Sequence, residues 1–365
     1  MLFRSKMCPL VHELRRRSAL EIRVCVTGQH RAMLDDVLTA FHVRADSDLA
    51  IMRPAQTLFE VTDAVLRGME QELDRHRPEL VLVHGDTTTA FAAALAAFYR
   101  RIPVGHVEAG LRTESLAAPF PEEWNRRAAD LLSEWCFAPT RAARDALLRE
   151  GKNDKRVFLT GNTVVDAMRF SLAADPEHPA LRWGEGHRLL LFTAHRRESL
   201  GGPMKGMFRA LRRVLEENPT CRAVFPVHEN PAVRALALEE LSGCPGLLLT
   251  GPLSMGVFRA LEERCCLCLT DSGGVQEECA ALGRPVLLMR ETTERPEALS
   301  EGVAVIVGTD PERICREARR LLTDADAYAR MARSCSAYGD AHACERIADV
   351  IEFGFCEPWN AAAGR

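Results

Sequence analysis

The sequence of 365 residues has no apolar run near the roughly 20 residues that are needed to span a bilayer. No apolar segment follows the first residues before the three arginines at 15–17, so we do not expect a secretory signal. The net charge of -4 gives no indication of a basic surface that would bind nucleic acid. Close internal repeats and low-complexity segments are also missing. These absences predict a globular cytoplasmic protein that binds neither membrane nor nucleic acid.

The 13 cysteines do not form a recognisable framework. Their number is odd, the chain is long, and several lie inside apolar runs, so we expect small, reduced core residues. Cys265, Cys266 and Cys268 lack a matching Cys/His pair at zinc spacing. We therefore expect no metal site.

The length exceeds one comfortable domain, and two series of alternating strands and helices fill it. The fold class is therefore α/β, with two Rossmann-like domains and a ligand cleft. We expect an N-terminal domain over 1–163, a second domain over 164–340, and a C-terminal helix in 341–365 that packs back on the first domain. The expected strands lie near 21–27, 49–52, 80–83, 104–107, 136–138, 188–193, 223–227, 247–249, 265–269, 286–289 and 303–307.

One stretch predicts a phosphate cradle, because a buried strand over 265–269 leads through small residues directly into a helix. Gly273 and Gly274 allow close backbone approach, Ser272 offers a hydroxyl, and the helix N-terminus offers unpaired N–H groups. Glu278 lies one turn further and could accept hydrogen bonds from ribose hydroxyls. Alternatively, Asp271 and Ser272 only cap an ordinary helix.

Carboxylates follow strand ends in the first half of the chain. Asp86 follows the strand over 80–83, although it could simply cap the next helix. Glu108 ends the strand over 104–107 and has no helix nearby to cap. Glu122 and Glu123 begin a helix, where the helix dipole alone favours acidic residues. Together these positions suit proton abstraction and donation, because neighbouring carboxylates separate each other's pKa values in a closed site.

Basic side chains follow strand ends in the second half. His195 is followed by two arginines after the strand over 188–193, which suits a diphosphate or a leaving group. The loop over 290–297 contains Arg295 and could either clamp phosphates or remain a solvated loop with internal ion pairs.

These motifs resemble those of the non-hydrolysing UDP-N-acetylglucosamine 2-epimerases. The resemblance extends from about Lys6 to Arg346, and its motifs are co-linear with those of the family. It rests on HGDTTTAFAAALAAFYRRIPVGHVEAGLRT (84–113), PFPEEWNRR (119–127), GNTVVDA (161–167), TAHRRES (193–199), PVHENP (226–231) and LTDSGGVQEECAALGRPVLLMRETTERPEAL (269–299).

The resemblance implies a GT-B-like pair of domains, often a homodimer, that interconverts UDP-GlcNAc and UDP-ManNAc without a nicotinamide or a metal. The implied route eliminates UDP to give 2-acetamidoglucal and then adds UDP back with C2 inverted, in the service of surface polysaccharide synthesis. The implied catalytic set is Asp86, Glu108, Glu122 and His195, and the implied substrate-binding set is Lys6, Arg126, Ser272, Gly273, Gly274, Glu278 and Arg295. Gln29, His30 and Gln56 fall where bacterial relatives bind an activating second UDP-GlcNAc.

The chain departs from the family pattern in three places. Family members begin with a strand and a Gly-Thr-Arg-Pro-Glu-Ala loop, and Met1–Ser5 stands there instead. We expect the natural start to lie upstream, since a strand missing from the middle of the sheet would leave backbone groups of its neighbours unpaired. The segment 254–258 replaces one that usually carries Tyr and Pro near the uracil, which bears on base affinity. Ala32 replaces a polar residue of the allosteric patch, which bears on activation.

Three functions remain open on the sequence. The first is the epimerase. The second is a hydrolysing relative, or an epimerase of a modified UDP-sugar. The third is a UDP-sugar-binding protein that lacks catalysis because the N-terminal loop is lost.

Overall fold

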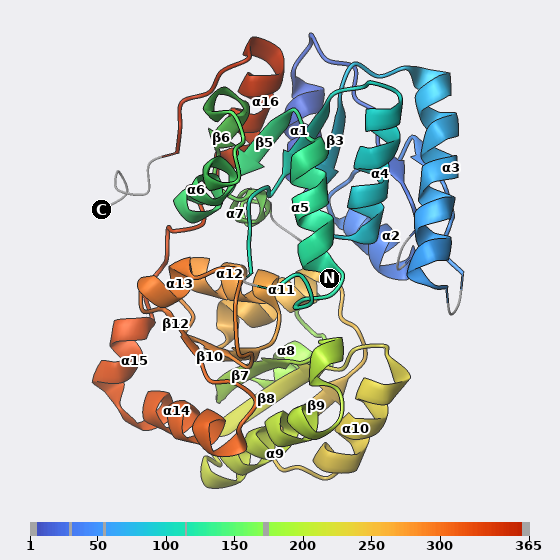
Figure 1. Ribbon diagram of the computed structural model, residues 1–365. Helices are drawn as coiled ribbons and strands as arrows, with labels where there is room; N and C mark the ends of the chain where they lie inside the picture. The colour runs from blue at the N-terminus through green and yellow to red at the C-terminus, as the bar shows by residue number, and fades with distance from the viewer. Residues whose placement is uncertain (1–5, 29–30, 54–55, 114, 171–174, 360–365) are drawn as a thin grey trace. The chain divides into compact units, whose positions relative to one another are not determined.

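The computed structural model describes residues 6–28, 31–53, 56–113, 115–170 and 175–359 (Figure 1). The chain forms two compact units. Unit 1 comprises residues 1–170 and 338–365, and unit 2 comprises residues 171–337. The sequence-based division was placed at 163/164 and 340/341, a few residues away from these boundaries.

Unit 1 contains six strands and a set of helices within the described ranges. The strands are β1 (Cys25–Val26), β2 (Ser47–Asp48), β3 (Val81–His84), β4 (Val104–Val107), β5 (Trp135–Ala138) and β6 (Val157–Leu159). The helices are α1 (Cys8–Arg16), α2 (Arg31–Ala40), α3 (Leu58–His76), α4 (Thr88–Tyr99), α5 (Glu122–Leu132), α6 (Arg141–Arg149), η1 (Asp154–Arg156), α7 (Thr163–Ala167) and α16 (Ala343–Phe353).

The strands of unit 1 pair only in parallel, in the order β3-β4-β5-β6, and β1 pairs with β2 in a separate ladder. The carboxyl ends of β3 and β4 therefore lie at one edge of the sheet, where Asp86 and Glu108 follow them. In the described part of the chain no strand joins β1 to β3. The C-terminal helix α16 packs against α1 and α7 and so belongs to unit 1 (Figure 1).

Unit 2 contains a second set of six strands. These are β7 (Arg188–Thr193), β8 (Cys221–Pro226), β9 (Leu247–Thr250), β10 (Leu267–Thr270), β11 (Val286–Leu288) and β12 (Ala304–Ile306). The helices are α8 (Pro179–Trp183), η2 (Arg197–Ser199), α9 (Gly202–Glu217), α10 (Pro231–Leu241), α11 (Met255–Arg264), α12 (Gly273–Ala281), α13 (Glu297–Ser300), α14 (Pro311–Thr323) and α15 (Ala325–Met331).

The parallel sheet of unit 2 has the order β12-β11-β10-β7-β8-β9. The chain builds from β7 outward through β8 and β9, and then returns to place β10 on the other side of β7. This reversal is a topological switch point, where α/β sheets leave a crevice at the carboxyl ends of their strands. His195 follows β7 and Asp271 follows β10, so the switch point places these two loops side by side.

Apolar side chains explain why these elements pack. The core of unit 2 combines strand residues such as Phe192 and Phe225 with helix residues such as Phe208, all of them buried. All 13 cysteines are free, and only Cys25 and Cys266 are not buried, which confirms the expected reduced core thiols. No helix in the described ranges is long and apolar enough to cross a membrane.

Most strands agree with the sequence-based expectation, but the first two do not. The strand expected over 21–27 is reduced to Cys25–Val26, and the strand expected over 49–52 is Ser47–Asp48. Each of these strands has only two residues, whose side chains are half-exposed or exposed, and the two strands pair with each other. A strand ends where its partner ends, and a single sequence does not show the partner.

Candidate functional site

Asp86 lies just after β3 and is nearly buried. Its Oδ2 accepts a hydrogen bond of 2.5 Å from Nη2 of Arg126, a buried residue of α5. Its Oδ1 is buried and accepts no hydrogen bond within the described residues. The helix that follows is capped by Thr87, whose hydroxyl accepts from the Ala90 N–H, so Asp86 is not the cap. A buried carboxylate oxygen without a donor suits a group that exchanges a proton with a ligand.

Glu108 is also buried, and its backbone φ is +66°. The left-handed region costs a non-glycine residue roughly 1 to 3 kcal/mol, and such strain gathers at functional sites. Lys6 donates to Oε1 of Glu108, Nδ2 of Asn162 donates to the same oxygen at 3.0 Å, and Nε2 of His84 lies 3.5 Å from Oε2. Lys6 therefore contacts an acidic candidate directly in this structure.

The two glutamates that begin α5 differ in their surroundings. Glu123 is fully buried, accepts from the Thr113 N–H at 3.1 Å, and contacts Arg127 at 2.7 Å and Arg126 at 3.5 Å. Glu122 is only half-buried. Glu123 thus serves the internal network, whereas Glu122 is the more accessible of the two.

A buried histidine of β4 links the loop after β3 to α5. His106 of β4 lies with Nδ1 2.6 Å from Oδ1 of Asp130 and with Nε2 2.8 Å from the Gly85 carbonyl oxygen. Asp130 also accepts from the Gly110 N–H at 3.2 Å and from Arg112 at 2.7 Å. Burial alone would raise the pKa of Asp130, but His106 and Arg112 hold it below its ordinary value.

In unit 2 the switch point brings His195 to Asp271. Nδ1 of His195 lies 2.9 Å from Oδ1 of the fully buried Asp271. Oδ2 of Asp271 accepts the backbone N–H groups of His195 and Arg196 at 2.8 and 2.9 Å. Burial opposes ionisation, but His195 and these N–H groups keep the pKa of Asp271 below its ordinary value. The ring of His195 also stacks on His228, with centroids 5.8 Å apart.

Three arginines of unit 2 surround one carboxylate, that of Glu294. Arg290 contacts it at 2.9 Å, Arg196 lies 3.7 Å away, and Arg295 also donates to it. Burial lowers the pKa of Arg290, and the neighbouring Arg196 and Arg295 lower it further although Glu294 opposes them. Arg295 has a second partner in Glu277, at 2.8 Å. Arg196 also lies 3.6 Å from Glu198. A cluster of guanidinium donors of this kind suits a multiply charged anion.

The start of α12 requires glycine. A Cβ on Gly273 would lie 2.4 Å from Nη1 and 2.9 Å from Cζ of Arg295. Ser272 occupies the N-cap position without a side-chain capping bond, which leaves the first N–H groups of the helix to other partners. Gly274, the next residue, is buried in the same first turn. This combination of a bare helix N-terminus and adjacent guanidinium groups is a familiar anion site.

Glu278 lies deeper in α12 than the sequence suggested. Its side chain is almost fully buried and contacts Nη2 of Arg259 at 3.2 Å. Arg259 also approaches Glu262 at 3.8 Å. Burial raises the pKa of Glu262 well above its ordinary value, and Glu278 raises it further. In this structure Glu278 therefore belongs to a buried cluster with Arg259 and Glu262.

The three expected allosteric positions are only partly described. Gln29 and His30 lie outside the described residues. Gln56 is half-buried, donates to the Ile51 carbonyl oxygen at 3.0 Å and accepts from the Arg53 N–H at 2.6 Å. In the ranges that the structure describes, no group of three His, Cys, Asp or Glu side chains is arranged to hold a metal.

Comparison with known proteins decides the family. A family model described as UDP-N-acetylglucosamine 2-epimerase matches residues 12–352. The chain belongs to the UDP-N-acetylglucosamine 2-epimerase family. It is 46% identical to the UDP-N-acetylglucosamine 2-epimerase of Bacillus subtilis (strain 168) over 350 residues, which cover 96% of this chain and 92% of that protein.

Solved structures of the epimerase family agree. A crystal structure of a putative UDP-N-acetylglucosamine 2-epimerase from Listeria monocytogenes has a TM-score of 0.92 and 44% identity, covering 95% of this chain and 92% of the other. The UDP-GlcNAc 2-epimerase from Neisseria meningitidis bound to UDP-GlcNAc has a TM-score of 0.91 and 40% identity, with coverage of 95% and 96%.

Some residues of this epimerase-family site were missed on the sequence. Asp271 was considered only as a helix cap, His106 only as part of a strand, and Asp130 not at all. Each contacts a partner that is distant in the sequence. Asp271, for example, contacts His195, which lies 76 positions earlier. The one available signal for Asp271 was its place after a buried strand, directly before the glycines.

Proposed function

We propose that this chain interconverts UDP-GlcNAc and UDP-ManNAc, and that it does so without net hydrolysis, in the supply of surface polysaccharide precursors. The observation that carries the proposal is the pairing of two acidic candidates of unit 1 with buried cations, Asp86 with Arg126 and Glu108 with Lys6, in a chain of this family. A nearby cation favours the ionised carboxylate that a base requires.

Unit 2 would hold the nucleotide. The guanidinium groups of Arg196, Arg290 and Arg295, together with the bare N-terminus of α12, offer donors for a diphosphate. His195 directs Nδ1 at Asp271, which leaves Nε2 to donate to a departing phosphate oxygen when the ring is protonated. Ser272, Gly273 and Gly274 would contact the phosphates. Glu278 would contact the ribose if the substrate draws it from Arg259.

Unit 1 would act on the sugar. A carboxylate removes the proton from C2 while the bond from C1 to the diphosphate oxygen breaks, and the electron pair of the C2–H bond becomes the C1–C2 double bond. UDP then adds back to C1 of 2-acetamidoglucal while an acid returns a proton to the opposite face of C2. Asp86, Glu108 and Glu122 are the acid/base candidates, and Arg126 and Lys6 contact the first two. No nicotinamide or metal enters this sequence of steps.

Product analysis by NMR tests the proposal. The purified chain is incubated with UDP-GlcNAc, and the expected result is an equilibrium of UDP-GlcNAc and UDP-ManNAc with unchanged total UDP-sugar. Accumulation of free ManNAc with UDP would instead establish the hydrolysing reaction. Binding of UDP in calorimetry without any new sugar signal would establish an inert binding protein.

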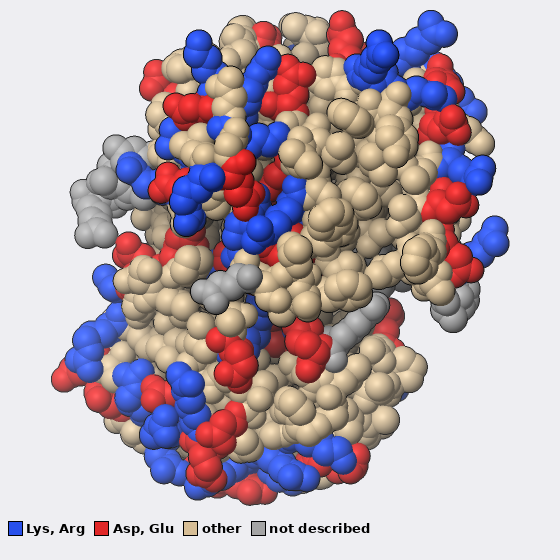
Figure 2. Space-filling model, viewed as in Figure 1, with Lys and Arg blue, Asp and Glu red and all other residues tan. Residues whose placement is uncertain are grey.

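A homodimer is part of the same proposal. Unit 1 exposes large apolar side chains on two helices that pack together: Phe98 (55%) and Tyr99 (67%) at the end of α4, and Trp124 (53%) and Leu131 (80%) on α5. Trp124 and Leu131 are seven residues apart and so share one face of α5. Figure 2 shows an extended uncharged region over the face that carries these helices. Such a patch suits a second copy of the chain.

The dimer is tested by light scattering of wild type and of the Leu131→Glu variant. We expect a wild-type dimer and a folded monomeric variant, because a charge in an apolar interface is costly. Arg67→Glu, at an exposed position of α3, is the matched control and should leave the mass unchanged. A monomeric wild-type chain would refute the dimer without touching the proposed reaction.

A further inference from the structure

His106 is a fully buried side chain that the proposed reaction does not use directly. It lies on β4, two residues before Glu108. Its two ring nitrogens face two different elements. Nδ1 lies against Asp130 of α5, and Nε2 lies against the carbonyl oxygen of Gly85, which follows β3.

Counting donors fixes the charge of the ring. A carbonyl oxygen can only accept, and Asp130 already accepts from the Gly110 N–H and from Arg112 on its other oxygen. His106 and Arg112 hold the pKa of Asp130 down against burial, so this carboxyl is ionised and also only accepts. Two acceptors require two ring N–H groups. The thiol of Cys136, near Asp130, stays neutral because burial raises its pKa to about 12.

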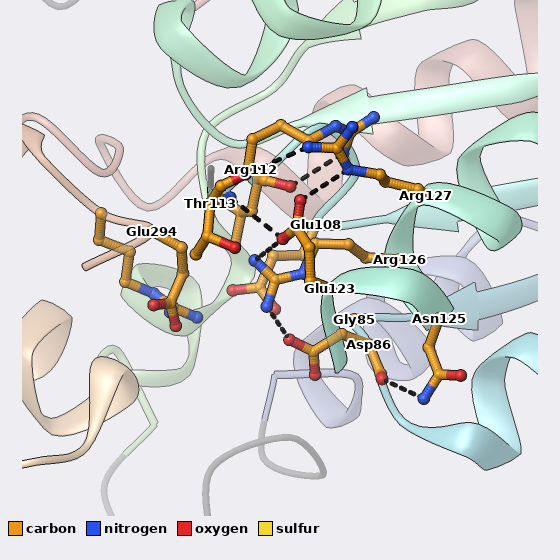
Figure 3. A network of polar contacts seen from close by, with 12 residues as sticks. Gly85, Asp86, Glu108, Arg112, Thr113, Glu123, Asn125, Arg126, Arg127 and Glu294 are labelled. Carbon is orange, nitrogen blue, oxygen red and sulfur yellow. Dashed lines mark hydrogen bonds and ion pairs between the residues drawn. The ribbon is translucent and has the colours of Figure 1, made fainter. Parts of the chain in front are cut away.

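The hydrogen bonds around Asp86 show what this cation fixes. The Gly85 carbonyl on one side of Asp86 accepts from His106, and the Asp86 carbonyl on the other side accepts from Nδ2 of Asn125 at 3.0 Å. The carboxylate itself accepts from Arg126. Asn125 and Arg126 of α5 hold the Asp86 carbonyl and its carboxylate (Figure 3). His106 of β4, which itself contacts Asp130 of α5, holds the Gly85 carbonyl.

We infer that His106 is a positioning residue: held as an imidazolium by Asp130, it fixes the peptide between Gly85 and Asp86 and thereby aims the Asp86 carboxylate. A neutral ring would turn a lone pair toward one of its two acceptors and release that loop. The catalytic consequence rests on the proposed function, in which Asp86 exchanges a proton with the sugar. The charge and the clamp do not depend on it.

The charge is tested by long-range ¹H–¹⁵N NMR of the full-length chain, with the His106 signals assigned by their loss in His106→Gln. We expect both ring nitrogens to carry a proton in the wild type at pH about 8, because each of them faces an acceptor. In Asp130→Asn one of the two nitrogens should be without its proton at the same pH. A neutral His106 ring in the wild type at pH about 8 would overturn the inference.

The clamp is tested by amide hydrogen exchange and kinetics, with Cys136→Ala as the control. Cys136 pairs with His106 across β4 and β5 and is equally buried, so its truncation reproduces a generic core defect. We expect His106→Gln to speed exchange of the Asp86 amide and to lower kcat by about 10- to 100-fold with KM within about threefold. Cys136→Ala should do neither.

Two results would contradict the clamp. One is unchanged exchange of the Asp86 amide in His106→Gln, and the other is a kcat loss that Cys136→Ala reproduces. If the wild-type chain converts no UDP-GlcNAc at all, the proposed function fails, whereas the ring-nitrogen signals and the Asp86 exchange still decide the role of His106.

Discussion

The buried charged side chains of the two units have different kinds of partners. In unit 1 several buried acidic side chains meet a cation, as in the pairs of Asp86 with Arg126 and of Asp130 with Arg112, and an Asp86 oxygen remains without a donor in the described residues. In unit 2 three guanidinium groups gather at the carboxylate of Glu294, and two of them have a further partner, Arg295 in Glu277 and Arg196 in Glu198. An open carboxylate oxygen suits proton transfer, whereas clustered guanidinium donors suit holding an anion. We therefore propose that unit 1 carries the chemistry and unit 2 binds the nucleotide.

The largest effect is expected for Asp86→Asn. An amide has the shape of the carboxylate but cannot accept the proton, so kcat should fall by about 10²- to 10⁴-fold. Binding of UDP in calorimetry should stay within about threefold of wild type, because the guanidinium cluster of unit 2 is untouched. Asp145→Asn, an exposed aspartate of α6, is the matched control and should keep full activity. A parallel loss of UDP binding in Asp86→Asn would break the division between the units.

Gly273→Ala should produce the opposite pattern. The new Cβ would displace the Arg295 guanidinium, so we expect the Kd for UDP to rise about tenfold or more, which corresponds to about 1.4 kcal/mol. Gly202→Ala is the control, since Gly202 is likewise the first residue of a helix and its Cβ would meet nothing within 4 Å. Calorimetry that shows the same Kd for both variants would contradict the phosphate site.

Asp271→Asn should change the stability of the fold by an amount that depends on pH. The pKa of Asp271 is lowered in the folded state, so its ionised form stabilises the fold above the unfolded pKa of about 3.9, and this contribution is lost as the pH falls through the folded value. We expect the free energy of unfolding of the variant to be about 1 to 3 kcal/mol lower than that of the wild type at pH near 7. This difference should become smaller below pH about 4. Urea denaturation at both pH values measures it. A difference in free energy of unfolding that grows at acid pH would contradict a stabilising role for the ionised Asp271.

Much of the framework could be predicted from the sequence, because strand periodicity and strand-end residues are local signals. The strand over 104–107 and the carboxylates after it are placed as expected, and the switch point in unit 2 follows from two α/β series. Local signals also assigned Gly273 and Arg295 to one site; this stays a prediction, although the Arg295 guanidinium lies where a Cβ of residue 273 would be.

The remaining features depend on contacts between distant residues. Glu278 was expected to accept hydrogen bonds from a ribose, but the burial of Arg259 and Glu262 beside it is a property of packing that no spacing reveals. Similarly, the same Asp-Ser-Gly-Gly sequence is compatible with a helix cap and with the observed anchor for His195. Only the pairing of β7 with β10 distinguishes them.

The central claim is that the chain exchanges the proton at C2 while it keeps the UDP-sugar intact. The most direct measurement is ¹H NMR of UDP-GlcNAc incubated with the wild-type chain in D₂O. The account predicts that deuterium replaces the C2 proton in UDP-ManNAc and, as the reaction reverses, in UDP-GlcNAc, without free ManNAc accumulating. UDP-ManNAc that retains its original C2 proton, or a substrate that never changes, would contradict it.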